Sequence, residues 1–411
     1  MAEASLERRP HRLAWSALGV LCAWSAWRGA AVALRPGAAS DFRIYWECGR
    51  AVVEGRDPFD VVGFIYLPGF AVAMAPFAAL PFPLALVLWQ ALSLAAVFAS
   101  ARLCARLAVA DGREARPWIG WAALLCVLRL VDSNLGNGQV NAFVFLLLLL
   151  GVAAWIDGRE RAGGLWIGLA AAAKIVPACL LLAMVARRAW RAAAATIASG
   201  LVFALLLPAS VLGWTATRSA LEAWWRREVR PYAAGGSTLL AARPHPPGQS
   251  LSAVAYGRLA DLDPDVVAWI VRGAQAMYLV VLVATLARLQ RRRPGTSRLE
   301  QIALVLVVAL TLAPLVHKAH LLWLMLPYAV LLAGPAAPLA PFARRARSVF
   351  LGLSVLLVGA TSPALLGRWL ATWSAAHHLI FLGMQCVLAA LLVDAWCAPA
   401  ADARRGTVRG T

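Results

Sequence analysis

Residues 40–81 read SDFRIYWECGRAVVEGRDPFDVVGFIYLPGFAVAMAPFAALP and lie between two long apolar runs. Asp41 follows Ser40, in a position where a short polar residue commonly starts a helix. The spacing predicts a short amphipathic helix over residues 41–54 that lies along a membrane surface, with one apolar face made of Tyr45, Gly49, Val52 and Val53. The prolines at positions 68, 76, 81 and 83 leave apolar pieces too short to cross a bilayer. We therefore predict that this stretch is a loop at the membrane surface, which connects the apolar run before it to the apolar run after it.

The composition of the chain indicates a membrane protein. Hydrophobic residues make up 62% of the 411 residues, far more than in a soluble domain of this length. The net charge of +19 comes from short basic clusters at alternate gaps between apolar runs, which is the pattern of cytoplasmic loops. This distribution excludes nucleic acid as an expected partner. The seven cysteines show neither a disulfide framework nor the spacing of metal ligands.

Apolar runs and basic clusters together predict the topology. The apolar runs that we assign to crossings, some of them short, cover residues 13–34, 84–107, 118–131, 140–156, 190–212, 266–287, 301–316, 321–332, 349–366 and 378–397. With two short arms at 162–186, we expect about twelve crossings and both ends of the chain in the cytoplasm. The first run could be a signal peptide, but we expect an uncleaved anchor that places Asp41 outside. We expect a single domain over residues 1–411 in the plasma membrane, with large extracytoplasmic loops at 35–83 and 213–265.

Residues 162–186 carry basic clusters at both ends, so the positive-inside rule favours a hairpin that enters and leaves on one side. Lys174 and Pro177 lie at the middle, where the turn would fall. Each arm would be roughly 18 Å long, short of the ~30 Å hydrocarbon core. The alternative is one continuous span with a mid-helix lysine and a proline kink. Lys174 and Lys318 are the chain's two lysines, and both lie in apolar surroundings.

Four polar groups of residues fall on the predicted outer side, and this common side favours a single site. They are Asp41; the run from Asn137 to Asn141 with Lys174; Gln249 with Ser250; and His317, Lys318 and His320. A carboxylate could accept the proton of a reacting hydroxyl, while amides, glycine backbone and ammonium groups could bind a sugar or phosphate. The structural alternative for each group is a helix cap or span end. Two histidines three apart could also hold a metal, but no third ligand is evident, so we predict no metal site.

Several motifs resemble those of glycosyltransferase family 87, whose members are polytopic hexosyltransferases with the GT-C fold. In chain order the motifs are Asp41-Phe42-x-x-Tyr45, Gly55-x-Asp57-Pro58-Phe59, Tyr66-x-Pro68, Pro76-x-x-x-Leu80-Pro81, Gly136-Asn137-Gly138-Gln139-Val140-Asn141, Gly168-Leu169-Ala170-Ala171-x-x-Lys174-x-x-Pro177, Gly248-Gln249-Ser250-Leu251 and Pro314-x-x-His317-Lys318-x-His320. Three features depart from the family pattern: Gly248 stands where the family has asparagine, His317 stands where it has tryptophan, and the two histidines are not adjacent here.

The resemblance implies a GT-C-like bundle with short half-spans and extracytoplasmic interfacial helices. It also implies transfer of a hexose, expected to be mannose, from a polyprenyl phosphate to a lipid-linked or cell-envelope glycan outside the cytoplasm, without a cofactor. Asp41 would be the catalytic base. Donor phosphate binding would fall to Lys174, His317, Lys318 and His320, helped by loop arginines such as Arg226, Arg227 and Arg230. Substrate binding would fall to Tyr45, Tyr66, Asn137, Gln139, Asn141, Gln249 and Ser250. The alternatives are a GT-C enzyme with another lipid-linked sugar, and a non-catalytic transporter or lipid flippase.

Overall fold

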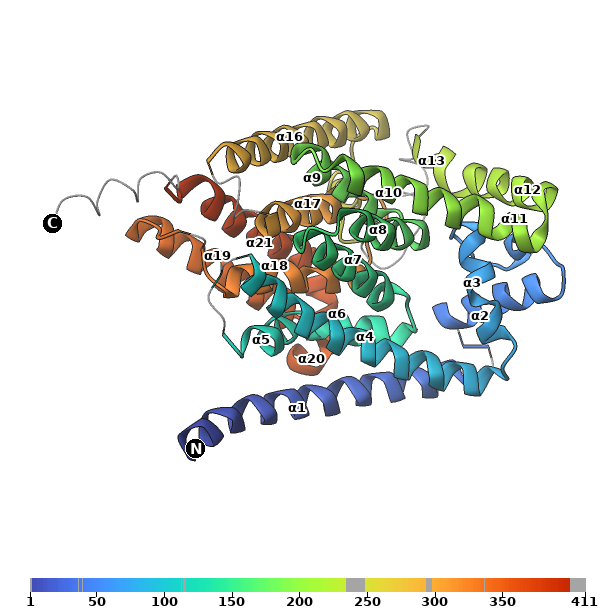
Figure 1. Ribbon diagram of the computed structural model, residues 1–411, viewed down its shortest axis with the longest axis horizontal. Helices are drawn as coiled ribbons and strands as arrows, with labels where there is room; N and C mark the ends of the chain where they lie inside the picture. The colour runs from blue at the N-terminus through green and yellow to red at the C-terminus, as the bar shows by residue number, and fades with distance from the viewer. Residues whose placement is uncertain are drawn as a thin grey trace. The chain divides into compact units, whose positions relative to one another are not determined.

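The structure is a computed structural model that describes residues 2–35, 37–38, 40–111, 113, 116–233, 248–292, 298–335 and 337–399. Every regular element in these ranges is a helix, as Figure 1 shows, so the all-α prediction is confirmed. The chain divides into two compact units. Unit 1 comprises Met1–Ser100, Leu130–Ala178 and Trp190–Pro244, and unit 2 comprises Ala101–Arg129, Cys179–Ala189 and His245–Thr411.

Unit 1 holds the helices of the first half of the chain. They are α1 (Ala2–Ala33), α2 (Asp41–Val53), η1 (Pro58–Asp60), α3 (Pro68–Ala78), most of α4 (Phe82–Ala110), most of α6 (Leu128–Asn137), α7 (Asn141–Ile156), α8 (Glu160–Ala173), α10 (Trp190–Leu201), η3 (Val202–Leu206), α11 (Leu207–Leu212), α12 (Trp214–Trp224), η4 (Trp225–Val229) and α13 (Arg230–Ala233). The short η2 (Val176–Cys179) ends at the unit boundary.

Unit 2 holds the remaining helices. They are the end of α4, α5 (Ile119–Cys126), α9 (Leu180–Ala186), α15 (Leu251–Arg258), α16 (Pro264–Arg292), α17 (Arg298–Leu312), η5 (Lys318–Leu324), α18 (Met325–Leu332), α19 (Pro341–Gly359), α20 (Pro363–Ala376) and α21 (Leu379–Cys397). Nearly all of α17 is buried, which makes it the central helix of this unit's core.

Four helices are long and apolar enough to cross a membrane in the part of the chain that the structure describes. They are α4, the continuous helix Trp190–Leu212, α16 and α21, and each covers a predicted span. A fifth crossing is possible if α5 and α6, bent by 66° at their junction, count as one broken span. The chain is therefore a polytopic membrane protein. Several other predicted spans are shorter apolar helices, such as Asn141–Ile156 and Lys318–Leu332, and the total of about twelve crossings stays a prediction.

The helix predicted after Ser40 is present, with small corrections. Ser40 is the extended N-cap and Asp41 is the first helical residue, so Asp41 is not the cap itself. Tyr45, Gly49 and Val52 are buried on one face as predicted. The prediction that Val53 belongs to this face is wrong. Val53 is 62% exposed, because it lies one position beyond the buried face, near the end of the helix.

Two predicted span ends are also wrong. The span at 118–131 was expected to stop at Asp132, but α6 continues to Asn137, since Asp132 accepts hydrogen bonds from Ser25 (2.6 Å) and Arg28 (2.5 Å) on α1. The helix expected over 349–366 runs instead from Pro341 to Gly359, and it is not among the helices that are long and apolar enough to cross a membrane. Pro363 then starts the separate helix α20, because proline favours the first turn of a helix.

The segment around Lys174 does not form one continuous helix. α8 ends at Ala173, Lys174 has an extended backbone (φ −157°, ψ 121°), and η2 follows. The break predicted at Lys174 and Pro177 is therefore confirmed, while the hairpin itself stays a prediction. Gly164 and Gly168 allow α8 to pack closely on α10, since a Cβ at either position would collide with the carbonyl of Ala192 or Thr196.

Candidate active site

Asp41 lies at the start of α2, in unit 1, with a half-buried side chain. Its carboxylate is close enough to interact electrostatically with Lys174, Tyr45 and Tyr66. An acidic residue in the first turn is favoured by the helix dipole, which helps to hold Asp41 there. The structure thus brings together four of the predicted site residues from three distant segments of the chain.

A chain of hydrogen bonds links Lys174 to the polar run before α7. The Lys174 ammonium donates to Asn141 Oδ1 at 2.6 Å, and Asn141 Nδ2 donates to Gln139 Oε1 at 2.6 Å. Asn141 is fully buried as the first residue of α7, whereas Lys174 is half-buried where α8 ends. The ammonium is therefore held by a neutral amide, and it retains donor capacity for an anionic group.

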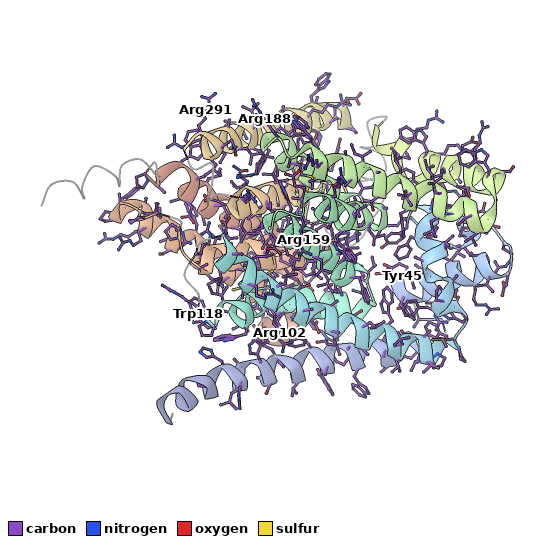
Figure 2. All side chains as sticks on the ribbon, in the orientation of Figure 1. Tyr45, Arg102, Trp118, Arg159, Arg188 and Arg291 are labelled. Carbon is purple, nitrogen blue, oxygen red and sulfur yellow. The ribbon has the colours of Figure 1, made fainter. Side chains whose placement is uncertain are left out.

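Aromatic side chains form one wall of this cluster. The hydroxyl groups of Tyr45 and Tyr66 are 2.8 Å apart, and Lys174 Nζ lies 5.9 Å from the centre of the Tyr66 ring. Phe70 stacks on Tyr66 with ring centroids 4.4 Å apart. Figure 2 labels Tyr45, which comes from α2. Burial raises the pKa of both tyrosines above the ordinary value, so both phenols stay neutral and can donate hydrogen bonds.

The turn at Gly138 is held by residues that the sequence analysis did not single out. Gly138 has φ +65°, and a Cβ there would lie 2.9 Å from Phe42 Cβ. Trp89 Nε1 donates to the Gly138 carbonyl at 2.9 Å, and Gln90 Nε2 donates to the Leu135 carbonyl at 2.9 Å, both from α4. A glutamine inside the apolar run 84–107 was the signal that could have identified this role.

Asn137 satisfies part of its hydrogen bonding inside the fold. Its Nδ2 donates to the Ser133 carbonyl at 2.8 Å, and its own carbonyl accepts from Ser40 Oγ at 3.4 Å. These contacts tie the end of α6 to the start of α2. A role for Asn137 in substrate binding stays a prediction.

The loop that leads to Tyr66 is held by the second large loop. Arg227 Nη1 donates to the Phe59 carbonyl at 2.6 Å, and Trp224 Nε1 donates to the Ile65 carbonyl at 3.3 Å. Ile65 directly precedes Tyr66, so α12 and η4 support the aromatic wall. Arg227, which was expected to bind phosphate, thus has a structural partner.

Gln249 and Ser250 lie in unit 2, where both are fully buried and serve structural contacts. The Ser250 hydroxyl accepts from Ala253 N at 3.2 Å as the N-cap of α15 and donates to the Pro314 carbonyl at 3.1 Å. Gln249 N donates to the Val316 carbonyl at 2.7 Å, and its Oε1 accepts from Phe381 N at 3.1 Å. The cap alternative is therefore confirmed for Ser250, and substrate binding by these two residues stays a prediction.

His317, Lys318 and His320 also lie in unit 2. His317 is the exposed N-cap of η5, and its backbone N–H donates to Nδ1 of the buried His320 at 3.1 Å. Lys318 is half-buried. The cap alternative is thus observed for the histidines, and their role with Lys318 in donor binding stays a prediction. In the described ranges, no three His, Cys, Asp or Glu side chains are grouped as metal ligands.

Comparison with known proteins identifies one family and several relatives. The model of glycosyltransferase family 87 matches residues 64–317, a range that includes Tyr66, Asn137 to Asn141, Lys174 and His317 but begins after Asp41. The polyprenol-phosphate-mannose-dependent alpha-(1-2)-phosphatidylinositol mannoside mannosyltransferase of Mycobacterium tuberculosis is 31% identical over 78% of this chain and 75% of its own length.

Two further relatives are more distant. The protein of the same description from Mycolicibacterium smegmatis is 28% identical over 71% of this chain and 69% of its own length. An alpha-(1->3)-arabinofuranosyltransferase of Mycobacterium tuberculosis is 29% identical over 39% of this chain and 36% of its own length. No solved structure matches the chain at a significant level.

Proposed function

This chain belongs to glycosyltransferase family 87, and from that premise we propose that it transfers mannose from a polyprenyl phosphate to a phosphatidylinositol mannoside or a related envelope glycolipid. Membership of the family makes the chain a glycosyltransferase, so the transporter alternative is set aside. The observation that carries the proposal is the grouping of a carboxylate, an ammonium and the side-chain amides of Gln139 and Asn141 around Asp41 and Lys174.

The reaction is a single displacement at the anomeric carbon. The acceptor hydroxyl oxygen forms the new bond to that carbon while the bond from the carbon to the phosphate oxygen breaks. Asp41 takes the proton of the hydroxyl, and polyprenyl phosphate leaves with the bonding electron pair. One displacement inverts the configuration at the anomeric carbon.

Lys174 binds the leaving phosphate in this proposal. The phosphate gains charge as the bond to the sugar breaks, so a nearby ammonium stabilises the transition state more than the ground state. Asn141 and Gln139 orient the ammonium through the hydrogen bonds described above. The Tyr45 and Tyr66 hydroxyl groups lie beside it and can bind sugar hydroxyls.

The finer architecture is part of the same proposal. We expect a GT-C-like bundle in the plasma membrane, in which 162–186 forms two half-spans and the reaction occurs on the extracytoplasmic face. The four candidate spans, the amphipathic α2 and the broken helix at Lys174 support it. This arrangement lets the enzyme take a donor that is itself dissolved in the bilayer.

A second candidate is transfer of arabinofuranose from a lipid-linked donor. The arabinofuranosyltransferase relative supports it, although it matches a smaller part of the chain than the mannosyltransferases do. The two donors differ in ring size and hydroxyl pattern, so a donor competition assay separates them.

The experiment compares wild type with Asp41→Asn in membranes supplied with radiolabelled polyprenyl phosphate mannose. We expect the variant to lose about 10²- to 10⁴-fold in transfer rate, the usual effect of a general base. Asp60→Asn is the matched control, because Asp60 is an exposed acid of the same loop. Equal transfer by Asp41→Asn and wild type would remove Asp41 from this role, and no transfer by wild type would reject mannose as the sugar.

A further inference from the structure

The second large loop forms a groove against the end of a membrane span. After Leu212 the chain turns at Gly213 (φ +81°), and α12 packs against α11, as Figure 1 shows. A groove of about 510 Å³ lies along this helix pair, within the range of ligand pockets. Its lining includes Leu205, Trp214, Leu221 and Trp225, with Arg218 and Arg226 as its basic residues.

The chemistry of the groove suits a phospholipid. Trp214 and Trp225 are 62% and 54% exposed beside a span, as tryptophans at a membrane interface are. The apolar lining suits an acyl chain. Arg218 is paired with Glu222 at 3.0 Å, whereas the exposed Arg226 uses its Nε for the Glu222 carbonyl at 3.3 Å. The terminal nitrogens of a guanidinium are good donors to a phosphate.

The backbone on both sides of the groove departs from regular α-helix. Leu205 lies in the π-helical segment Val202–Leu206, and Trp225 and Arg226 lie in the π-helical segment Trp225–Val229. Such segments are rare and occur frequently at functional sites. Two of them facing one groove support a binding role for it.

The groove is connected to the Asp41 cluster, which consists of Asp41, Tyr45, Tyr66, Asn141 and Lys174. Trp224, another residue of the lining, donates to the Ile65 carbonyl next to Tyr66. The lining shares no residue with the Asp41 cluster as described above. The groove therefore adjoins the proposed active site and has its own cations.

We propose that this groove binds the phospholipid anchor of the acceptor, an inference that rests on the proposed function. The donor phosphate is bonded to the reacting carbon, so it has to lie beside Asp41, where Lys174 is the available cation. The acceptor phosphate is separated from its reacting hydroxyl by sugar. A second basic site that adjoins the cluster without being part of it matches that separation.

The test measures KM for three substrates with the full-length Arg226→Gln protein. They are polyprenyl phosphate mannose, phosphatidylinositol mannoside, and methyl α-mannoside as an acceptor without a lipid anchor. We expect KM for phosphatidylinositol mannoside to rise about tenfold, the effect of losing one charge-assisted hydrogen bond. KM for methyl α-mannoside should not change. An unchanged KM for the donor would show that Arg226 serves the lipid acceptor and not the donor phosphate, which is the role that the family resemblance implied for it. Arg56→Gln is the control, since Arg56 is an exposed arginine of the first loop paired with Glu54.

A second variant and a second measurement complete the test. Leu221→Trp fills the groove and should weaken the lipid acceptor alone, with turnover of methyl α-mannoside showing that the protein is folded. Retention of phosphatidylinositol by the purified protein, measured by native mass spectrometry, should fall in both variants. A rise in the donor KM instead would assign the groove to the donor. Unchanged lipid retention and unchanged KM values would overturn the inference, whereas wild type that retains the lipid but transfers no mannose would reject only the proposed function.

Discussion

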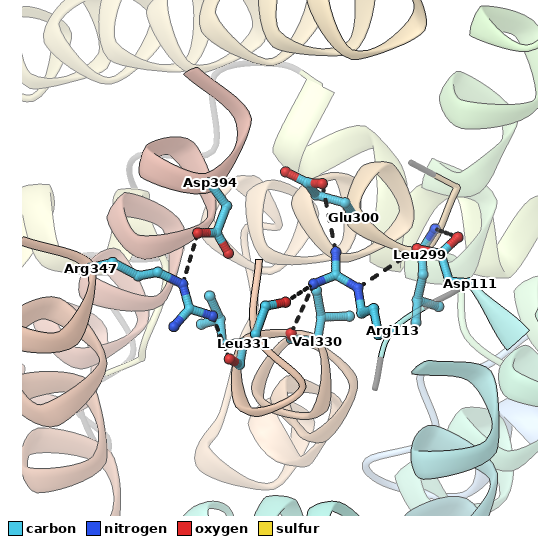
Figure 3. Close-up of polar contacts among 9 residues, drawn as sticks. Asp111, Arg113, Leu299, Glu300, Val330, Leu331, Arg347 and Asp394 are labelled. Carbon is cyan, nitrogen blue, oxygen red and sulfur yellow. Dashed lines mark hydrogen bonds and ion pairs between the residues drawn. The ribbon is translucent and has the colours of Figure 1, made fainter. Parts of the chain in front are cut away.

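Two polar clusters, one in each unit, differ in how their charges are matched. In unit 2, Arg113 lies 3.7 Å from the Asp111 carboxylate and 3.6 Å from that of Glu300, and it also donates to the carbonyls of Val330 and Gly334. Figure 3 shows this network, together with the 2.7 Å pair of Arg347 and Asp394. In unit 1, the Lys174 ammonium donates to a neutral amide and the Asp41 carboxylate lies half-buried nearby.

The difference indicates two functions for charge in this fold. Where an acid and a base face each other in a dry core, removing one leaves the other uncompensated, so the pair holds helix ends in place. Where a base is supported by an amide, its charge remains available to a ligand. We therefore expect the unit 2 cluster to control stability and the unit 1 cluster to control catalysis, and three predictions test this contrast.

The largest expected effect on stability comes from Arg113→Leu. This substitution removes the guanidinium that faces the buried carboxylates of Asp111 and Glu300. Leaving these carboxylates without it should lower the free energy of unfolding by about 3–5 kcal/mol. Denaturant or thermal unfolding in detergent measures it. Arg159→Leu is the matched control, because Arg159 forms an exposed pair with Asp157 and such pairs contribute at most about 1 kcal/mol. Equal stability of the two variants would contradict a structural function for the network.

A smaller effect, on catalysis, is expected for Lys174→Gln. Loss of a charge-assisted contact to the donor phosphate should lower kcat/KM about tenfold to a hundredfold. The unfolding free energy should stay close to that of wild type, because glutamine can still donate to Asn141 Oδ1. Kinetics with polyprenyl phosphate mannose and unfolding in detergent give both values. A variant that loses stability like Arg113→Leu but keeps its activity would show that Lys174 is structural.

The smallest effect is the pH dependence of the unit 2 network. Burial raises the pKa of Asp111, which follows the end of α4, to about 6, and the positive charge of Arg113 opposes this rise. A carboxyl whose folded pKa is raised binds its proton more tightly in the folded state, so stability rises as the pH falls through 6. Between pH ~7 and ~6 the gain is roughly 0.4 kcal/mol. Unfolding of Asp111→Asn should lack this component, and a variant with the same pH dependence as wild type would contradict the assignment.

Particular residues show how far sequence reasoning reaches. The helix starting at Asp41, the span at 190–212 and the break at Lys174 could be predicted, because each depends on local spacing, apolar content or a proline. The helical course of α6 through Asp132 could not be predicted, since it depends on partners on α1 more than 100 residues away. Arg113 lies in one of the basic clusters between apolar runs, which are typical of cytoplasmic loops, yet it is buried among acids that no local pattern reveals.

The sequence alone determined that this protein lies in the membrane and which family it resembles, and it located the four apolar runs that form helices long enough to cross a bilayer. These properties follow from hydrophobicity, charge and short motifs that act locally. Only the tertiary structure decided that Lys174 reaches Asn141, 33 residues away, and that Trp224 supports the residue before Tyr66. Contacts of this kind depend on how helices pack, and packing is set by many side chains at once.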